Sequence, residues 1–375
     1  MKKSISIVSV ITLILSSVLI FNGCGYEYQY PSVIGDYTNH NLQGTTLNVY
    51  NWGEYISDGS EDSIDVIKEF EELTGIKVNY STFDSNESMY SLISNGSVSY
   101  DIVIPSDYMI ERMIKENLLQ KIDTSKLSNY HYIDEGYKNL YYDPNNEYSI
   151  PYSVGMVGLI YNTSIVKETP DSWGIMWDEK YKNDVLTFNN PRDAFAIAQF
   201  YLGQDINTEN KSEWDRAAKL LKEQKSVLQA YVMDEVYNKM ESGSAAIAPY
   251  YAGDYLSMVD VNEDLAFVYP KEGTNIFVDA LCIPKCAENY DAAMLFINYL
   301  LEPEIALANA EFIYYASPNT SVTTNPEYSL LGNEILYPEE SKKPKTEYFH
   351  DMKPEIRSNF DKLWQDVKLY RHPSK

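Results

Sequence analysis

The sequence predicts an α/β protein with two lobes, each a mostly parallel sheet flanked by helices, and a cleft at the hinge between them. Three observations support this prediction. Strand-like and helix-like segments alternate from Leu47 onward. The length that follows a short apolar leader suits two domains of ordinary size. Two apolar stretches have the strand character needed to carry the chain into a second lobe and back again.

The first lobe is predicted from a strand–helix alternation. Apolar residues recur at helical spacing at Ile64, Ile67 and Phe70, and Gly75 stands where a helix C-cap glycine belongs. Because the order is β-α-β-α-β, we expect a largely parallel sheet whose ligands collect beyond the carboxyl ends of the strands. The expected elements are strands at 47–51, 76–80 and 101–104 and helices at 64–73, 88–94 and 108–118.

A second set of strand and helix patterns predicts the other lobe. Residues 150–162 are rich in β-formers and residues 277–283 form another apolar strand candidate, so we expect both to cross between the lobes. The other expected elements are strands at 185–188, 246–249 and 266–269 and helices at 214–221, 232–240 and 292–301. The expected lobes are 46–153 with 279–325 and 154–278 with 326–375.

The N-terminus indicates export. Lys2 and Lys3 precede an apolar run over residues 5–21, which is typical of a secretory signal peptide, here residues 1–23. A transmembrane anchor is the alternative, but seventeen residues interrupted by four serines are short for a membrane span. Cys24 follows a loose lipobox, so we expect a lipidated Cys24 that anchors the protein to the membrane. Residues 24–45 would then form a polar tether, with the protein in the periplasm or at the cell surface.

The charge of the chain limits its partners. The expected signal peptide holds two lysines and no acid, so its removal leaves 28 basic and 55 acidic residues, a net charge of −27. Nucleic acid is an unsuitable partner for such a chain, because phosphate binding requires positive charge. An acidic surface favours the arrival of cations. It also fits a protein that is merely well solvated, and charge alone does not separate the two interpretations.

Motifs for metal, nucleotide or hydrolytic chemistry are absent from the sequence. No histidine pairs with another at metal-ligand spacing, and there is neither a glycine-rich phosphate loop nor a G-x-S-x-G elbow, so we expect no metal and no cofactor. A carboxylate pair for glycoside hydrolysis stays open, because the many acids always supply candidates. Cys282 and Cys286 could form a disulfide or remain two buried thiols.

The predicted strand ends carry aromatic, hydroxyl and carboxylate side chains. Single residues also have structural explanations: Trp52 could be core, Asp193 a helix cap, and Gly253 with Asp254 a turn. The candidate ligand residues are Trp52, Glu54 and Tyr55 at one strand end, Ser106 and Tyr108 at the next, Asn190 and Asp193 before a helix, Tyr251 after a small-residue strand, and Phe277 and Asp279 on a crossover.

Several of these motifs, taken in order, resemble the periplasmic spermidine/putrescine-binding proteins of ABC importers. The resemblance runs from about Thr46 to Pro338 and implies the two-lobed periplasmic-binding-protein-like fold, with a polyamine held in its cleft by acids and aromatics. The motifs are 51–56 (NWGEYI), 100–106 (YDIVIPS), 143–146 (DPNN), 150–152 (IPY), 269–273 (YPKEG), 298–301 (NYLL) with Pro303, and 316–319 (ASPN).

Residue roles follow from the resemblance by position. Acids in the family pair with the ammonium groups, two aromatics flank the methylene chain, and further residues donate or accept hydrogen bonds. These roles imply Glu54, Asp193 and Asp279 as the acids, Trp52 and Tyr315 as the flanking rings, and Tyr55, Ser106 and Tyr108 as hydrogen-bonding partners. Tyr251 and Phe277 stand where the family often has tryptophan, and Asn190 stands where some members have aspartate. The choice of polyamine therefore stays open.

The predicted function is capture of spermidine or putrescine and delivery to the permease subunits of an ABC transporter, by a monomer that is not an enzyme. Aromatic faces and carboxylates suit a ligand that is an apolar chain with charges along it. One alternative is a binding protein for another solute, such as a sugar or iron, but iron would need clustered tyrosines or histidines. Another is an exported enzyme that acts on polysaccharide, which would need two carboxyls facing one bond.

Overall fold

The computed structural model describes residues 37–371 except Asn39 and Ser97. The predicted signal peptide, Cys24 and the first part of the predicted tether lie outside the described residues. Among the residues described, no helix is both long and apolar enough to cross a bilayer.

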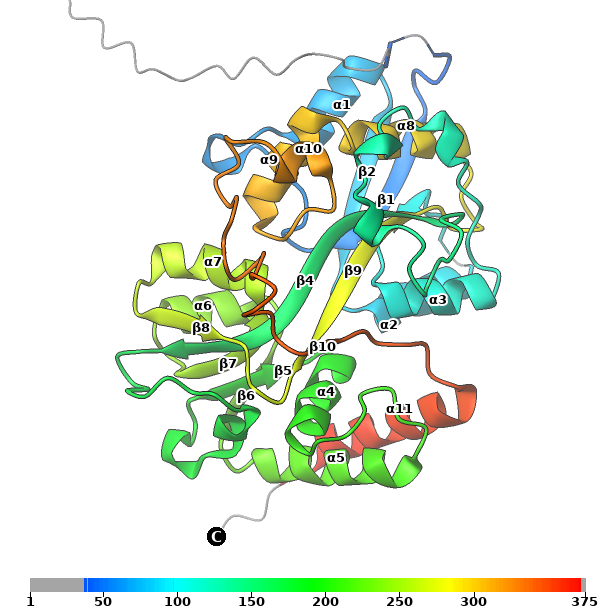
Figure 1. Ribbon diagram of the computed structural model, residues 1–375. Coiled ribbons are helices and arrows are strands. Elements are labelled where there is room, and N and C mark those ends of the chain that lie inside the picture. Colours follow the sequence, from blue (N-terminus) through cyan, green and yellow to red (C-terminus); the bar gives the residue numbers. More distant parts are fainter. Residues whose placement is uncertain (1–36, 39, 97, 372–375) are drawn as a thin grey trace, which may run out of the picture. The chain divides into compact units, whose positions relative to one another are not determined.

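The strands form one continuous sheet with two parallel groups joined by two long crossing strands (Figure 1). The strand order is β2-β1-β3-β9-β4-β7-β5-β6, with β10 paired to β9 and β8 paired to β4. The strands are β1 (Thr46–Trp52), β2 (Lys77–Phe83), β3 (Ile102–Val103), β4 (Ser149–Asn162), β5 (Val185–Phe188), β6 (Leu228–Val232), β7 (Ile247–Tyr251), β8 (Leu265–Val268), β9 (Thr274–Cys282) and β10 (Thr346–Glu347).

Strand direction divides the sheet into a first half, β2-β1-β3, and a second half, β7-β5-β6. Pairs inside each half are parallel, as the sequence predicts. β4 runs antiparallel to β7, β8 and β9, whereas β9 is antiparallel to β3 and β4 and parallel to the short β10. β4 pairs with β9 up to Met156 and with β7 from Val157, so this single strand passes from one half to the other. Both predicted crossovers are therefore present, side by side, and the lobe boundaries that we placed within them remain a prediction.

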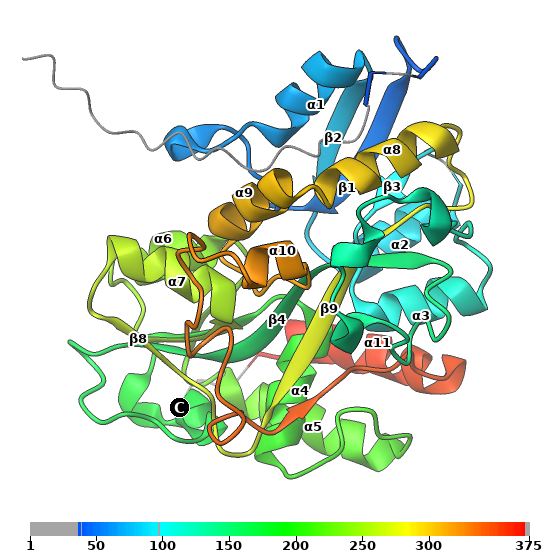
Figure 2. The same ribbon diagram turned by 45° about the horizontal axis from the view of Figure 1, so that its top comes forward.

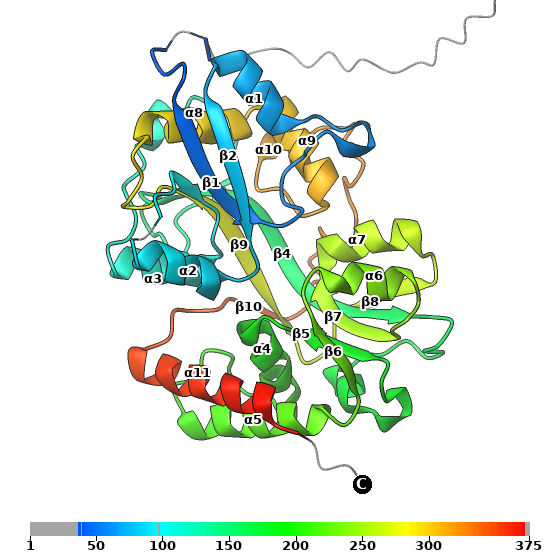
Figure 3. The same ribbon diagram turned by 180° about the vertical axis from the view of Figure 1, so that it is seen from behind.

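Helices cover both halves of the sheet (Figures 1 and 2). The α-helices are α1 (Val66–Thr74), α2 (Asn86–Ser94), α3 (Asp107–Lys115), α4 (Pro191–Tyr201), α5 (Lys211–Gln224), α6 (Glu235–Glu241), α7 (Ala252–Val261), α8 (Tyr290–Leu300), α9 (Pro303–Ile313), α10 (Thr320–Thr323) and α11 (Pro354–Leu369). The C-terminal α11 lies alongside α5 in the second half, far from it in sequence (Figure 3). Phe195, Trp214 and Phe360 form the core between α4, α5 and α11.

Of the two capping residues suggested by the sequence, Gly75 is confirmed and Asp193 is not a cap. Gly75 ends α1 with a φ of 71°, and its N–H donates to the Glu71 carbonyl at 2.8 Å, because glycine adopts this left-handed conformation without a Cβ clash. At α4 the cap is Asn190, whose side chain accepts from the Arg192 N–H. Asp193, which the sequence offered as a cap, lies in the first turn of that helix.

Other local expectations are corrected. Gly253 and Asp254 lie in the first turn of α7 instead of forming a turn between elements, because the backbone continues from β7 directly into a helix. Cys282 and Cys286 do not form a disulfide, and of these two only Cys282 is buried. Tyr37, within the predicted tether, is buried, and its hydroxyl donates to Glu302 Oε1 at 2.6 Å, so the end of that segment packs against the first half.

Candidate ligand-binding cleft

A cavity of about 80 Å³ lies where the carboxyl ends of both parallel groups meet the crossing strands. Ten of the eleven side chains predicted to bind ligand line it, contributed by both halves and by β9. They are Trp52, Tyr55, Ser106, Tyr108, Asn190, Asp193, Tyr251, Phe277, Asp279 and Tyr315. Residues that are up to 263 positions apart in the chain therefore converge at one place, as expected for the carboxyl edges of α/β sheets.

Glu54 is the predicted residue that the cavity does not include. It follows β1 with a left-handed φ of 49°, and its side chain is exposed. Burial raises the pKa of Asp234, and the negative charges of Asp84 and Glu54 act in the same direction, so Glu54 influences a residue of the cavity wall. Asp84 and Asp234 both line the cavity, and the sequence reasoning missed them.

Asp279 is the central carboxylate. It lies on β9 with 3% of its surface exposed, and the Tyr55 hydroxyl donates to its Oδ2 at 2.6 Å. The Ser153 hydroxyl lies against the same phenol oxygen, while Asp279 Oδ1 meets no hydrogen-bond partner among the described residues. Burial raises the pKa of Asp279 to about 6, opposed by the hydroxyl groups of Ser106 and Tyr55. A buried carboxylate with a free oxygen favours a ligand that brings a hydrogen-bond donor and a positive charge.

Asp193 is the second buried carboxylate, on α4 of the second half. It is 4% exposed, and the Tyr251 hydroxyl donates to its Oδ2 at 2.8 Å. Burial raises its pKa to about 7, and the hydroxyl of Tyr251 is the largest influence in the opposite direction. Because Asn190 is the N-cap and α4 begins at Pro191, Asp193 lies in the first turn of the helix and lines the cavity from there.

Asp254 is a third carboxylate at the cavity, and the sequence reasoning did not select it. It lies in the first turn of α7, three residues after the end of β7. It accepts hydrogen bonds from the hydroxyls of Tyr237 and Tyr315, the latter at 2.7 Å, and burial raises its pKa to about 6. Its position could have identified it from the sequence. Because β7 is parallel to β5, the residues just after β7 lie at the carboxyl edge of the sheet, where ligands bind.

Aromatic rings form the walls of the cavity. The Trp52 indole N–H donates to the Ile104 carbonyl at 2.9 Å, which fixes the ring at the end of β1. Tyr55 meets Tyr315 edge to face at a centroid distance of 5.3 Å, and Tyr251 meets Phe277 in the same way at 5.4 Å. Such arrangements hold the rings in place and expose apolar faces to a ligand.

Two glycines make room for these rings. A Cβ on Gly155 would lie 2.2 Å from the Phe277 ring, and a Cβ on Gly253 would lie 2.3 Å from the Tyr315 ring. Neither glycine has a left-handed φ, so close approach of the aromatic ring, and not backbone conformation, explains the residue type.

Three predicted polar residues already have protein partners. Ser106 Oγ accepts from the Asn86 amide at 3.0 Å, the Tyr108 hydroxyl donates to Glu87 Oε1 at 3.0 Å, and the Asn190 amide donates to the Tyr251 hydroxyl at 3.5 Å. These groups therefore position the cavity wall as well as lining it.

Arg192 is a buried cation at one end of the cavity, and it was also missed. It is 1% exposed, and its guanidinium lies 4.3 Å from the centroid of the Phe349 ring. Burial lowers its pKa, and the charges of Glu87 and Asp193 act against that shift. Phe349 comes from the C-terminal segment, beyond the region in which the sequence allowed residue placement.

The electrostatic character of the cleft is acidic with one positive end. Asp193, Asp254 and Asp279 line the cavity together with the tyrosines that donate hydrogen bonds to them. Arg192 is the positively charged residue of the same lining. Within the part of the chain that the structure describes, no group of three or more His, Cys, Asp or Glu side chains is placed to hold a metal. The arrangement suits an elongated organic cation with apolar character.

Comparisons with known proteins agree with this geometry. Residues 65–333 match the family described as bacterial extracellular solute-binding protein. A spermidine/putrescine-binding periplasmic protein of Salmonella typhimurium is 33% identical over 334 residues, which are 88% of this chain and 94% of the relative.

Solved structures have the same architecture. One from Listeria monocytogenes is 36% identical with a TM-score of 0.83, covering 87% of this chain and all of that chain. A lipoprotein of Treponema pallidum is 27% identical with a TM-score of 0.74, covering 86% of this chain and 99% of the other. The predicted two-lobed α/β fold is therefore confirmed.

Proposed function

The chain belongs to the bacterial extracellular solute-binding protein family, and from this premise we propose that it captures a polyamine, spermidine or putrescine, and delivers it to the permease of an ABC transporter. The observation that carries this proposal is the set of three carboxylates, Asp193, Asp254 and Asp279, in one aromatic-walled cavity. Asp193 and Asp279 are buried, and Asp254 is half-buried. The name of the Salmonella relative supports the same ligand class.

The chemistry of a polyamine explains why these residues occur together. Its methylene segments lose contact with water when they lie between rings such as Trp52 and Tyr315. Each ammonium group must find a carboxylate, because an unpaired buried charge is costly. The pKa values of the three carboxylates are raised because burial disfavours their charged form, and a bound ammonium would reverse that effect.

Calorimetric titration with putrescine and spermidine tests the ligand class directly. We expect saturable binding of at least one of them, with glucose as a neutral control of comparable size. Mass spectrometry of the recovered ligand tests whether the protein acts as a carrier, because a carrier releases its ligand unchanged. Absence of binding to both polyamines would contradict the proposal.

We expect the affinity for a polyamine to fall as the pH is lowered from about 8 to about 5. The pKa of Asp193 is raised to about 7 and those of Asp254 and Asp279 to about 6, so these groups gain protons in this range. An ammonium group pairs with the ionised form, so each bound proton must leave and the affinity rises with pH through these values. Titration across this range measures the effect.

The stability of the ligand-free fold should change with pH in the opposite direction to the affinity. The folded-state pKa values of these carboxyls lie above the value of about 3.9 for an unfolded aspartate. They therefore stabilise the fold below that value and lose this contribution as the pH rises through 6 to 7. The increase in Tm caused by putrescine should be larger at pH 8 than at pH 5, and an equal or smaller increase would contradict the assignment.

We also propose that Cys24 carries a lipid anchor and that the protein acts as a monomer outside the cytoplasmic membrane. The lipobox-like residues before Cys24 and the description of the Treponema relative as a lipoprotein support the anchor. Size-exclusion chromatography with light scattering tests the monomer.

Replacing Cys24 with alanine should release the protein from membranes while polyamine affinity stays unchanged. An acylated cysteine attaches the chain to the bilayer, and the substitution removes the site of attachment. Fractionation of expressing cells, with Cys286→Ala as a matched control, measures the release. Membrane retention of a processed Cys24 variant would contradict lipidation.

A further inference from the structure

The segment 348–351, which we call the strap, contacts both halves of the molecule. It runs from β10 to α11 and passes between α3 and α4 (Figures 1 and 3). On the second half, the Asn207 side chain donates to the Tyr348 carbonyl at 2.8 Å and accepts from the His350 N–H at 2.7 Å. On the first half, the Tyr141 hydroxyl donates to the Phe349 carbonyl. The strap therefore adds non-covalent contacts between the halves to the connections that the chain makes through β4, β9 and the segment from α10 to β10.

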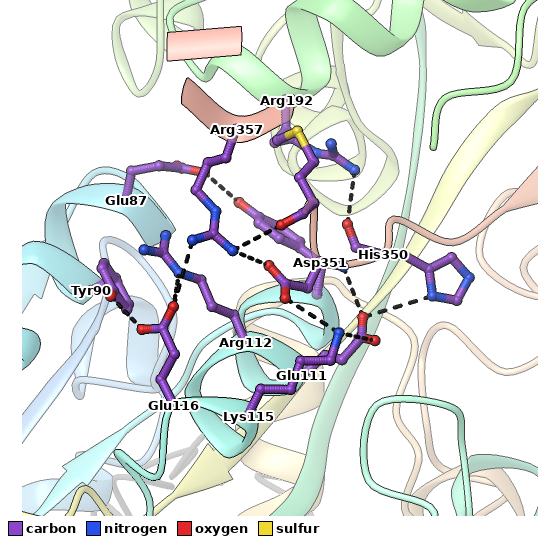
Figure 4. Close-up of polar contacts among 12 residues, drawn as sticks. Glu87, Tyr90, Glu111, Arg112, Lys115, Glu116, Arg192, His350, Asp351 and Arg357 are labelled. Carbon is purple, nitrogen blue, oxygen red and sulfur yellow. Dashed lines mark hydrogen bonds and ion pairs between the residues drawn. The ribbon is translucent and has the colours of Figure 1, made fainter. Parts of the chain in front are cut away.

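Charged side chains of α3 continue this contact (Figure 4). Lys115 donates to Glu111 at 2.8 Å and to Asp351 at 3.3 Å, and the Asp351 N–H donates to Glu111 Oε2 at 2.8 Å. The Glu111 and Asp351 side chains are only 17% and 11% exposed. Because these two carboxylates are mostly shielded from water, salt screens their interactions less than those of an exposed pair.

A second group of ion pairs joins the end of α3 to α11 and the strap. Arg357 donates to Asp351 at 2.6 Å, and its other terminal nitrogen lies 3.5 Å from Glu116. Arg112 donates to the same oxygen of Glu116 at 3.1 Å, and its guanidinium lies 3.5 Å from the centroid of the Tyr90 ring. Both carboxylates of this contact, Asp351 and Glu116, thus bind a cation from each half, which makes the contact a network and not an isolated pair.

The strap also reaches the ligand cavity. Phe349 lines the cavity and packs edge to face against Tyr108 of the first half at a centroid distance of 5.8 Å. Arg192 of the second half also contacts the strap, because its terminal nitrogen donates to the His350 carbonyl at 3.4 Å. Phe349, which lines the cavity, and Asp351, which belongs to the ion-pair network, are therefore only two positions apart in the chain.

We propose that Glu111, Lys115 and Glu116 of the first half, together with Asp351 and Arg357, form a latch that holds the halves closed and slows ligand release. The chain itself joins the halves through β4, β9 and the segment from α10 to β10. Hinge opening about these connections would separate α3 from the strap and break these ion pairs. Contacts made only in the closed form lower the dissociation rate and leave the association rate unchanged. The test by ligand release rests on the proposed polyamine binding.

The test compares Lys115→Met with Lys121→Met. Lys121 pairs with Glu147 at 2.8 Å within the first half, and the two lysines have similar side-chain exposure, 53% and 61%. Both variants remove one positive charge from the first half, so general effects on a cationic ligand are matched. We expect Lys115→Met to raise the dissociation rate of putrescine about threefold to tenfold in stopped-flow measurements, with an unchanged association rate. Lys121→Met should change neither rate.

A double-mutant cycle and hydrogen exchange complete the experiment. Asp351→Asn combined with Lys115→Met should raise the dissociation rate less than the product of the single effects, because both remove the same contact. Exchange at residues 346–353 in ligand-free protein should also be faster in Lys115→Met than in Lys121→Met. Equal rates and equal exchange in the two lysine variants would overturn the latch. Failure of the parent to bind polyamines would instead overturn the proposed function, and the exchange result would still decide on the latch.

Discussion

Replacing Asp279 with asparagine should remove most of the affinity for both putrescine and spermidine while the ligand-free fold stays intact. The residue is buried on the crossing strand β9, and its carboxylate lines the cavity. Without its charge, a bound ammonium would be desolvated and unpaired. The expected loss is about 2–5 kcal/mol, on the order of thirtyfold to several thousandfold in Kd.

The ligand-free protein should not lose stability in the same experiment. Asparagine can still accept the hydrogen bond from the Tyr55 hydroxyl, and it removes a charge whose burial is unfavourable above pH 6. Asp291→Asn is the matched control, because it removes one exposed acid from the first turn of α8. Calorimetric titration and thermal melts of the three proteins separate the outcomes. Equal affinity in Asp279→Asn and Asp291→Asn would show that the central acid is wrongly assigned.

Replacing Gly253 with alanine should weaken polyamine binding at least tenfold and also destabilise the fold. The new Cβ would lie 2.3 Å from the Tyr315 ring and 3.0 Å from the Tyr314 carbonyl oxygen, so the ring must move. Its displacement breaks the hydrogen bond to Asp254 and the edge contact with Tyr55. Overpacking of this kind costs about 1–3 kcal/mol of unfolding free energy, measured by denaturant titration.

Tyr315→Phe separates the ring from its hydroxyl. This variant keeps the aromatic wall and loses only the hydrogen bond to Asp254 at 2.7 Å, so its loss of affinity should be smaller than that of Gly253→Ala. An alanine variant that binds as tightly as the parent would mean that the position of the Tyr315 ring is unimportant for the ligand.

Local features of the fold were readable from the sequence because they depend on neighbouring residues. The helical spacing before Gly75 predicted α1 and its end, and strand patterns predicted the two crossing strands. Elements with weaker patterns were not predicted: β6 was missed, and α7, α9 and α11 were not identified as helices. Their formation depends on burial against partners that lie elsewhere in the chain.

The sequence by itself determined the class of chemistry at the site and ten of the side chains that line it. Most of these were found because the carboxyl ends of strands in α/β sheets meet at one edge, so residues at those ends converge. Phe277 and Asp279 were found on the predicted crossing strand, and Tyr315 was implied only by the family resemblance. The tertiary structure decided the rest. Asp254 and Arg192 enter the cavity through helix starts, Phe349 through the strap, and Glu54 turns outward on a left-handed backbone. Periodicity reports the local backbone, whereas convergence of these side chains depends on how distant segments pack.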